Sequence, residues 1–127
     1  MKHNDLTGMI IGAAMKVHTH FGQGFPEYVY ERALIIELKN LGLVCNQQME
    51  KEITYQNMVI GKRRLDILVE GMVLVELKAR KDWFLSSLNQ ILNYMKIFKI
   101  EIGLLFNFSG PSLTYKRFIL TQSEESE

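Results

Sequence analysis

The sequence predicts an α/β domain in which helices pack on a mixed β-sheet. The order of periodicities supports this class, because two helical segments come first, three strands follow, and another helix precedes two more strands. A continuous apolar run over residues 102–108 is typical of a buried strand. The helix between the third and fourth strands can serve as a right-handed crossover to a parallel neighbour.

Three helices are expected, over residues 5–20, 26–41 and 83–99. Pro26 suits the first turn of the second helix, and Gly42 stops that helix. Asp82 is expected to cap the third helix with its side chain. The inward stripe of the second helix is expected to hold Tyr30, Leu34, Leu38 and Leu41.

Two histidines near the end of the first helix, His18 and His20, look like a metal pair. Residues two apart on a helix point to nearly opposite sides, which disfavours metal binding by this pair. We therefore expect both side chains to be exposed near the helix end.

Five strands are expected, over residues 51–55, 59–69, 72–80, 102–108 and 113–120. The first three should form a meander whose first turn lies near Gln56-Asn57. In the second strand, alternation places Asp66 and Leu68 on one face. The other face of that strand should carry Leu65, Ile67 and Val69.

Three ionisable side chains interrupt the second and third strands where a sheet should be apolar. Side chains two apart share a face, so Glu76 and Lys78 should project the same way. Asp66 should lie opposite Glu76 on that face if residues 70–72 form a three-residue loop. A two-residue turn would place it opposite Val75 instead. We expect the three-residue loop.

This triad of side chains has a chemical meaning. Two carboxylates close together repel, unless one keeps its proton or a cation lies between them. Mg²⁺ prefers one or two carboxylates with backbone oxygens, waters and substrate phosphate. A lysine beside such an ion can orient or deprotonate a water, which favours phosphodiester hydrolysis. The alternative is a cross-strand pair in which Lys78 balances one carboxylate on a solvated face.

Two helical positions add polar candidates. Glu27 lies on the inward stripe of the second helix, where a carboxylate is costly without a partner. The alternative is a favourable charge near a helix N-terminus. Gln90 and Tyr94 stand one above the other on the third helix and can hydrogen-bond a carboxylate, a metal-bound water or a phosphate. Ordinary helix surface is the alternative for this pair.

Composition bounds the class of protein. The 127 residues are expected to form a single domain over residues 1–120, followed by a polar acidic tail over residues 121–127 that should be disordered. The chain is 47% hydrophobic and 23% charged, as in soluble globular proteins. No apolar run approaches the roughly 18–20 residues of a membrane span, and residues 1–5 lack the plan of a signal peptide. With a single cysteine, Cys45, these features fit a reducing cytoplasm.

The formal charge of +1 is unevenly distributed. Residues 62–117 hold ten basic and five acidic side chains, so the region around the candidate site suits a polyanion. Scattered solvating lysines are the alternative explanation.

Taken in order, these motifs resemble a known family. The segment from Gly24 to Glu27, Asp66, Glu76-Leu77-Lys78 and the segment from Gln90 to Tyr94 resemble the RecB-like branch of the PD-(D/E)xK nuclease superfamily. Gly24-x-x-Glu27-x-x-Tyr30, together with the length of the chain, is similar to the small GxxExxY proteins of that superfamily. The resemblance extends from about residue 6 to residue 120 and implies a restriction-endonuclease-like core.

The resemblance also implies roles for individual residues. Asp66, Glu76 and the Leu77 carbonyl would hold Mg²⁺ or Mn²⁺, with Glu27 in the outer shell of the metal. Lys78 would contact the attacking water or the scissile phosphate. Gln90 and Tyr94 would orient substrate or ligands. The side chains expected to hold the nucleic-acid backbone are Arg64, Arg80, Lys81 and Lys116.

The sequence therefore favours a Mg²⁺-dependent nuclease acting on nucleic acid, with DNA preferred. The alternative is a catalytically silent, nuclease-like module that binds nucleic acid or a protein partner, because a fold does not prove an activity. A third alternative assigns these charges to stability alone. We expect no membrane association, and a homodimer is compatible with so small a domain.

Overall fold

The structure is a computed structural model that describes residues 3–120. Its three helices are α1 (Asn4–Phe21), α2 (Glu27–Asn40) and α3 (Phe84–Phe98). Its strands are β1 (Cys45–Gln47), β2 (Glu50–Tyr55), β3 (Met58–Arg64), β4 (Ile67–Val69), β5 (Val73–Lys78), β6 (Ile102–Asn107) and β7 (Thr114–Ile119). The tail predicted over residues 121–127 lies outside this description.

Five strands form one mixed sheet in the order β1-β4-β5-β6-β7. The neighbours β5 and β6 are parallel and are joined through α3, whereas the other pairs in the sheet are antiparallel. The predicted α/β class and the parallel crossover are therefore confirmed. Strand β1 was not predicted, because its residues show little apolar alternation.

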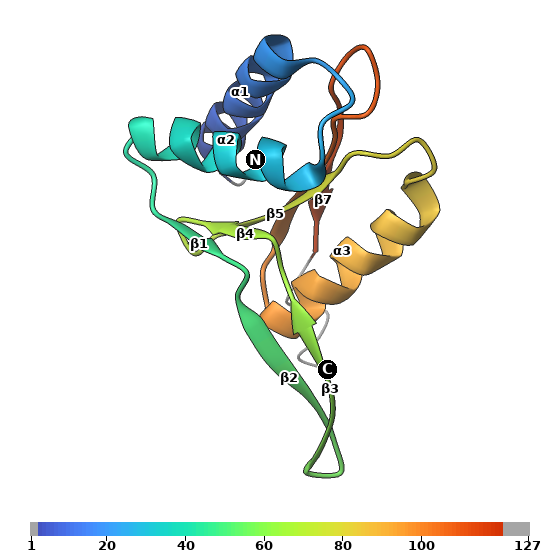
Figure 1. Ribbon diagram of the computed structural model, residues 1–127. Coiled ribbons are helices and arrows are strands. Elements are labelled where there is room, and N and C mark those ends of the chain that lie inside the picture. The colour runs from blue at the N-terminus through green and yellow to red at the C-terminus, as the bar shows by residue number, and fades with distance from the viewer. Residues whose placement is uncertain (1–2, 121–127) are drawn as a thin grey trace.

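Helices cover both faces of this sheet, with α1 and α2 on one side and α3 on the other (Figure 1). The side chains of Val73, Val75 and Leu77 pack toward α1 and α2. Leu74 and Leu105 pack toward α3. The sheet is thus buried on both faces, and a charged side chain in its centre must have a specific partner.

The predicted strand over residues 59–69 is broken, and the predicted meander is wrong. The chain bends at Leu65 and Asp66, so β2 and β3 form a separate two-stranded hairpin, while β4 joins the main sheet. Leu65 packs into the core on the α3 side instead of sharing a face with Ile67 and Val69. The bend is held by hydrogen bonds from the Leu65 N–H to the Met49 carbonyl and from the Gln48 N–H to the Asp66 carbonyl.

Three local predictions also need correction. Trp83 is the N-cap of α3, and no side chain caps that helix, so Asp82 does not have the predicted role. Leu41 is exposed because α2 ends one residue earlier. His18 is buried, and its Nε2 hydrogen-bonds the Gly110 carbonyl at 2.9 Å, because the loop after β6 folds back onto α1.

The loop between β4 and β5 has the predicted three residues. Val69 pairs with Val73, and Ile67 pairs with Val75. Continued by one residue, this register brings Asp66 opposite Glu76. None of the helices within residues 3–120 is both long and apolar enough to span a bilayer.

The close approach of α3 to β6 depends on Gly103. A Cβ atom at this position would lie 2.8 Å from Met95 Sδ and 3.1 Å from Ile91 Cδ1. We predict that Gly103→Val lowers the free energy of unfolding by about 1–3 kcal/mol through overpacking. Urea denaturation checks this value.

The matched control is Gly8→Ala in α1, where an added Cβ meets nothing within 4 Å. Alanine favours a helix by about 1 kcal/mol over glycine, so this variant should be at least as stable as the wild type. If the two variants had equal stability, the packing argument at Gly103 would be wrong.

Candidate active site

Asp66 and Glu76 meet at the bend where β4 begins. The Asp66 N–H donates to Glu76 Oε1 at 3.0 Å, and the Leu77 N–H donates to Asp66 Oδ2 at 2.9 Å. Each carboxylate thus accepts a hydrogen bond from the backbone beside the other. The expected convergence of the two carboxylates is present, on the α3 side of the sheet.

Glu76 is the buried member of this pair. Its side chain is 2% exposed. Desolvation by burial, followed by the adjacent charge of Asp66, raises the pKa of Glu76 to about 9. A side-chain hydrogen bond between the two carboxyl groups also favours the protonated form. The raised pKa favours the protonated form of Glu76, which limits the repulsion between the two groups when no cation is bound.

Lys78, two residues after Glu76 on β5, lines a cavity of about 500 Å³. The cavity lies between the end of β5, the base of β3 and the polar face of α3. It is lined by Arg63, Lys78, Arg80, Ser86, Asn89, Gln90 and Asn93. These side chains can bind an anion through charge and hydrogen bonds, as a phosphate diester requires.

Glu27 reaches the same site from the opposite layer. It is the first residue of α2, and the backbone N–H of Ala79 hydrogen-bonds its carboxylate. Partial desolvation raises the pKa of Glu27, and the nearby Asp66 adds to that effect, whereas Lys78 opposes it. Glu27 is exposed, so its predicted place on the inward stripe of the helix is wrong, because the first turn of α2 lies at the edge of the packed layer. The charges of Lys78 and Asp66 nevertheless act on its carboxylate.

The turn before Glu27 is fixed by Tyr30. The Tyr30 hydroxyl donates to the Gly22 carbonyl at 2.6 Å and accepts from the Phe25 N–H at 3.2 Å. Its ring is fully buried and stacks on Phe108 at 4.5 Å between centroids. Gly24 in the same turn has φ 103°, a backbone conformation that favours glycine. Gly24 and Tyr30 therefore set the direction from which Glu27 approaches.

Gln90 and Tyr94 are adjacent on α3, as the helical spacing predicted. Gln90 Nε2 donates to the Tyr94 hydroxyl at 2.8 Å. Desolvation, followed by the charge of Glu76, raises the pKa of Tyr94. The two side chains therefore link α3 to the site.

The other predicted basic residues lie at different distances from the pair. Arg80 lines the cavity. Lys116 is aligned with Glu76 across the sheet, with Leu105 between them, so it lies on the same face two strands away. Lys81 is exposed in the loop before α3. Arg64 lies on the face of the hairpin opposite to Arg63 and does not line the cavity.

Sequence reasoning missed Arg63, Ser86, Asn89 and Asn93 as cavity residues. Asn89 and Asn93 are four apart and, with Gln90, give α3 a polar face, which was the available signal. No signal marked Arg63 over Arg64, because the choice depends on the direction in which the hairpin leaves the sheet.

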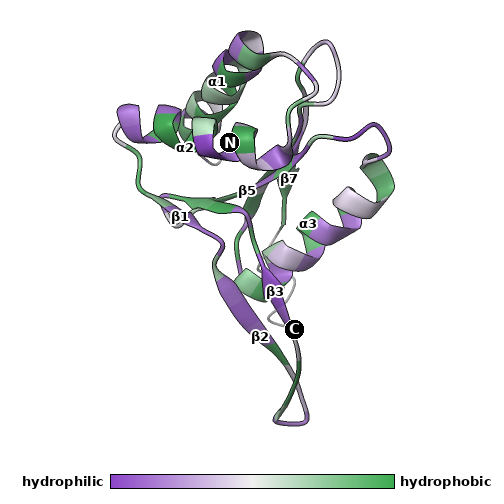
Figure 2. Ribbon diagram, viewed as in Figure 1, coloured by the Kyte–Doolittle hydropathy of each residue, from purple (hydrophilic) through white to green (hydrophobic). Residues whose placement is uncertain are grey.

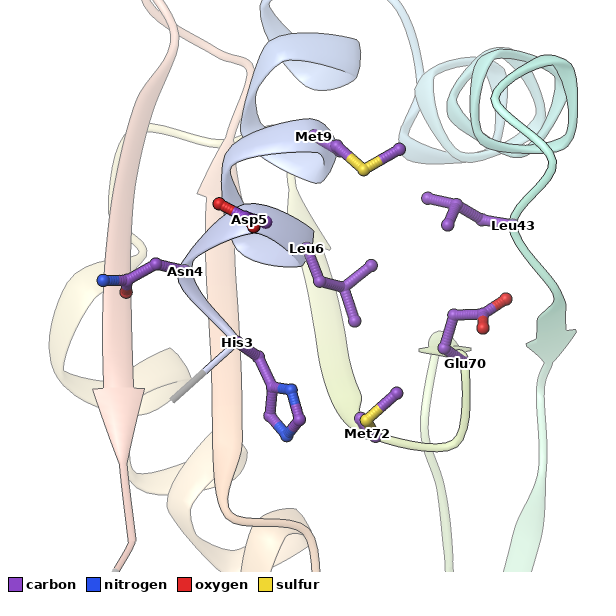
Figure 3. A pocket seen from close by; sticks show the side chains of 8 residues that line it. All are labelled: His3, Asn4, Asp5, Leu6, Met9, Leu43, Glu70 and Met72. Carbon is purple, nitrogen blue, oxygen red and sulfur yellow. The ribbon is translucent and has the colours of Figure 1, made fainter. Parts of the chain in front are cut away.

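A larger cavity lies away from this chemistry. It is found at the other end of β5, where His3 and Leu6 at the start of α1 face Glu70 and Met72 of the β4–β5 loop (Figure 3). The six residues of β5 separate the two ends by about 20 Å. This cavity therefore takes no part in the candidate site.

The donor set at the bend fits a hard divalent cation. Within residues 3–120, no group of three or more His, Cys, Asp and Glu side chains is placed to coordinate a metal ion without further ligands. Mg²⁺ is usually bound by only one or two carboxylates, with waters and phosphate completing its shell. Asp66 and Glu76 supply that minimum of two carboxyl groups, so the residues at the bend fit such an ion.

We predict that the chelator-treated protein becomes less stable as pH rises from about 5 to 9. The unfolded state releases the Glu76 proton near the ordinary pKa of 4.5, whereas the folded state retains it to about 9. The free energy of unfolding should fall by up to about 1.4 kcal/mol per pH unit in this window. Denaturant titrations in EDTA at several pH values measure the slope.

Glu76→Gln should remove most of this slope, since glutamine does not titrate. Glu50→Gln, on the exposed hairpin, is the matched control and should retain it. Equal slopes in the wild type and Glu76→Gln would show that Glu76 does not hold its proton.

A second prediction concerns the turn before α2. Tyr30→Phe leaves the ring packing intact but removes both hydroxyl hydrogen bonds, so the free energy of unfolding should fall by about 1–3 kcal/mol. Hydrogen exchange should also become faster across residues 22–27. Tyr28→Phe is the control, because Tyr28 is 56% exposed. Equal losses in the two variants would contradict the role of the buried hydroxyl.

Comparisons with known proteins agree with this geometry. The model of the PD-(D/E)XK nuclease superfamily matches residues 4–118. No curated protein matches the sequence. The solved structure described as "Crystal structure of SSO0001" is similar, with a TM-score of 0.51 and 15% identity, over 94% of this chain and 68% of the other.

An alkaline exonuclease from Laribacter hongkongensis is also similar, with a TM-score of 0.45 and 11% identity, over 99% of this chain and 75% of the other. The family match spans nearly all of the described residues, and the mixed sheet has the expected restriction-endonuclease-like core. This chain belongs to the PD-(D/E)XK nuclease superfamily.

Proposed function

We propose that the protein is a divalent-metal-dependent nuclease that hydrolyses phosphodiester bonds in nucleic acid, with DNA preferred. The observation that carries this proposal is the reciprocal hydrogen bonding of Asp66 and Glu76 beside Lys78. A buried Glu76 held against the half-buried Asp66 is costly for stability alone, whereas a cation between the two groups would offset that cost.

Each residue has a distinct role in the proposed reaction. Asp66, Glu76 and the Leu77 carbonyl would hold Mg²⁺ or Mn²⁺, which when bound polarises phosphate oxygens and lowers the pKa of water. Lys78 would neutralise charge on the phosphate or orient the attacking water. Glu27 would act in the outer shell, because it lies in the electrostatic field of Lys78 and Asp66 but belongs to another layer.

Gln90 and Tyr94 are proposed to position the ligands or the substrate. Their mutual hydrogen bond aligns both side chains on one side of α3, next to Glu76. Arg80 would hold the nucleic-acid backbone at the cavity, with Lys81 and Lys116 farther out, whereas Arg64 lies on the other face of the hairpin and is not given this role. Such contacts recognise phosphate without reading base sequence.

Within the superfamily, we propose that the chain belongs with the small GxxExxY proteins. The three residues of that motif occupy complementary positions in the structure. Gly24 adopts the positive φ of the turn, Tyr30 fixes the turn with its hydroxyl, and Glu27 carries the carboxylate toward the site. These positions support a role of the motif in orienting Glu27.

The test is cleavage of a labelled oligonucleotide in Mg²⁺ or Mn²⁺. We predict that Glu76→Gln and Lys78→Met each lower the rate by about 100-fold or more, because each removes charge that the transition state requires. Lys96→Met is the control, since Lys96 is exposed on α3 and does not line the cavity. RNA of the same sequence tests the proposed preference for DNA.

Metal binding has its own readout. Mg²⁺ or Mn²⁺ should raise the melting temperature of the wild type and should not raise that of Glu76→Gln. If the metal binds and DNA binds but no variant or wild-type protein cuts, a catalytically silent binding module is the better account. If no metal binds at millimolar concentration, the proposed ligand roles of Asp66 and Glu76 are wrong.

A further inference from the structure

The β2–β3 hairpin has two chemically different faces. It projects away from the body of the protein (Figure 1), and its strands turn through Gln56 and Asn57, which both have positive φ. Register places Lys51 opposite Arg63, Ile53 opposite Gly61 and Tyr55 opposite Met58 on one face. We call this the basic face, and it consists of Lys51, Ile53, Tyr55, Met58, Gly61 and Arg63.

The opposite face of the hairpin is charge-balanced. There Glu50 lies opposite Arg64, and Glu52 lies opposite Lys62. Opposite charges across a ladder stabilise a strand pair, whereas like charges directly opposite destabilise it. The basic face carries the unfavourable arrangement, because Lys51 and Arg63 are like charges in register. Among the described residues, neither forms an ion pair with a carboxylate.

The basic face is continuous with the candidate active site. Arg63 belongs to the hairpin and also lines the cavity that contains Lys78 and Gln90. Its charge reaches the Tyr94 hydroxyl beside the carboxylate pair. Lys51 shares the face of Arg63. A polyanion that extends from the cavity along the hairpin would therefore pass next to Lys51.

The outer half of the hairpin is apolar and exposed. Figure 2 shows a hydrophilic body of β2 and a hydrophobic stretch toward the tip. The exposed fractions are 65% for Tyr55 and 68% for Met58 on the basic face. An aromatic side chain that follows phosphate-binding residues can stack on an unpaired base, and such stacking does not depend on sequence.

We propose that the basic face of the β2–β3 hairpin is a nucleic-acid-binding arm, which binds the substrate strand next to the scissile phosphate. Lys51 and Arg63 bind one phosphate group between them, and Tyr55 stacks on an unpaired base farther along the same strand. The substrate class that this arm recognises is single-stranded nucleic acid. The inference rests on the proposed function for the position of the scissile bond.

The test measures binding in EDTA, so that cleavage does not interfere. A fluorescent 20-nucleotide single strand and the blunt duplex of the same sequence are titrated by anisotropy at several salt concentrations. Lys51→Ala should weaken single-strand binding and reduce the slope of log K against log salt by about 0.7, as expected for one lost phosphate contact. Tyr55→Ala should weaken it by about tenfold with no change in slope.

Lys62→Ala is the matched control, because it removes the same charge from the same hairpin on the opposite face. It should leave both affinity and slope near the wild-type values. Thermal unfolding of each variant shows whether the hairpin remains folded. Equal effects of Lys51→Ala and Lys62→Ala would overturn the basic face, and so would equal affinity for the duplex and the single strand.

The two proposals fail separately in this design. If the wild type cuts but the Lys51 and Tyr55 variants bind as the wild type does, the nuclease proposal stands and the arm is wrong. If the wild type does not cut but the two variants lose binding, the arm stands as a binding surface.

Discussion

The site depends on one constraint, which is that two carboxylates share the space at a bend in the chain. Glu76 accepts a hydrogen bond from the Asp66 N–H, and Asp66 accepts one from the Leu77 N–H. A shift of either carboxylate therefore breaks a hydrogen bond to the backbone of the other segment. The bend that makes this exchange possible also ends β3 and releases the hairpin from the sheet. Local backbone geometry, carboxylate placement and the direction of the hairpin therefore have a common cause.

The two helical layers supply different functions to this site. On the α3 side, a polar helix face closes a cavity around Lys78. On the other side, the turn between α1 and α2 directs Glu27 toward the end of β5, and the buried Tyr30 hydroxyl holds that turn. Because Tyr30 also stacks on Phe108 after β6, the position of Glu27 is linked to the central parallel strands. The motif residues thus act through the core as well as at the surface.

The hairpin contributes little to the core, which explains why its two faces can differ so sharply. A strand buried on both sides must be apolar throughout, as β5 and β6 are apart from Glu76, Lys78 and Asn107. A projecting two-stranded ribbon has no such requirement, so its side chains are free to serve a ligand. The unfavourable pair of Lys51 and Arg63 is tolerated in solvent, and an anion between the two side chains would relieve their repulsion.

The sequence by itself determined the α/β class, the three helices, the loop of three residues after β4 and the expected pairing of Asp66 with Glu76. These follow from periodicity and register, which are local properties of the chain. Tertiary structure alone decided the break at Leu65, the burial of His18 and the choice of Arg63 over Arg64 for the cavity. Each of these depends on contacts between segments distant in the chain, and a pattern of alternating residues does not record where a strand leaves its sheet.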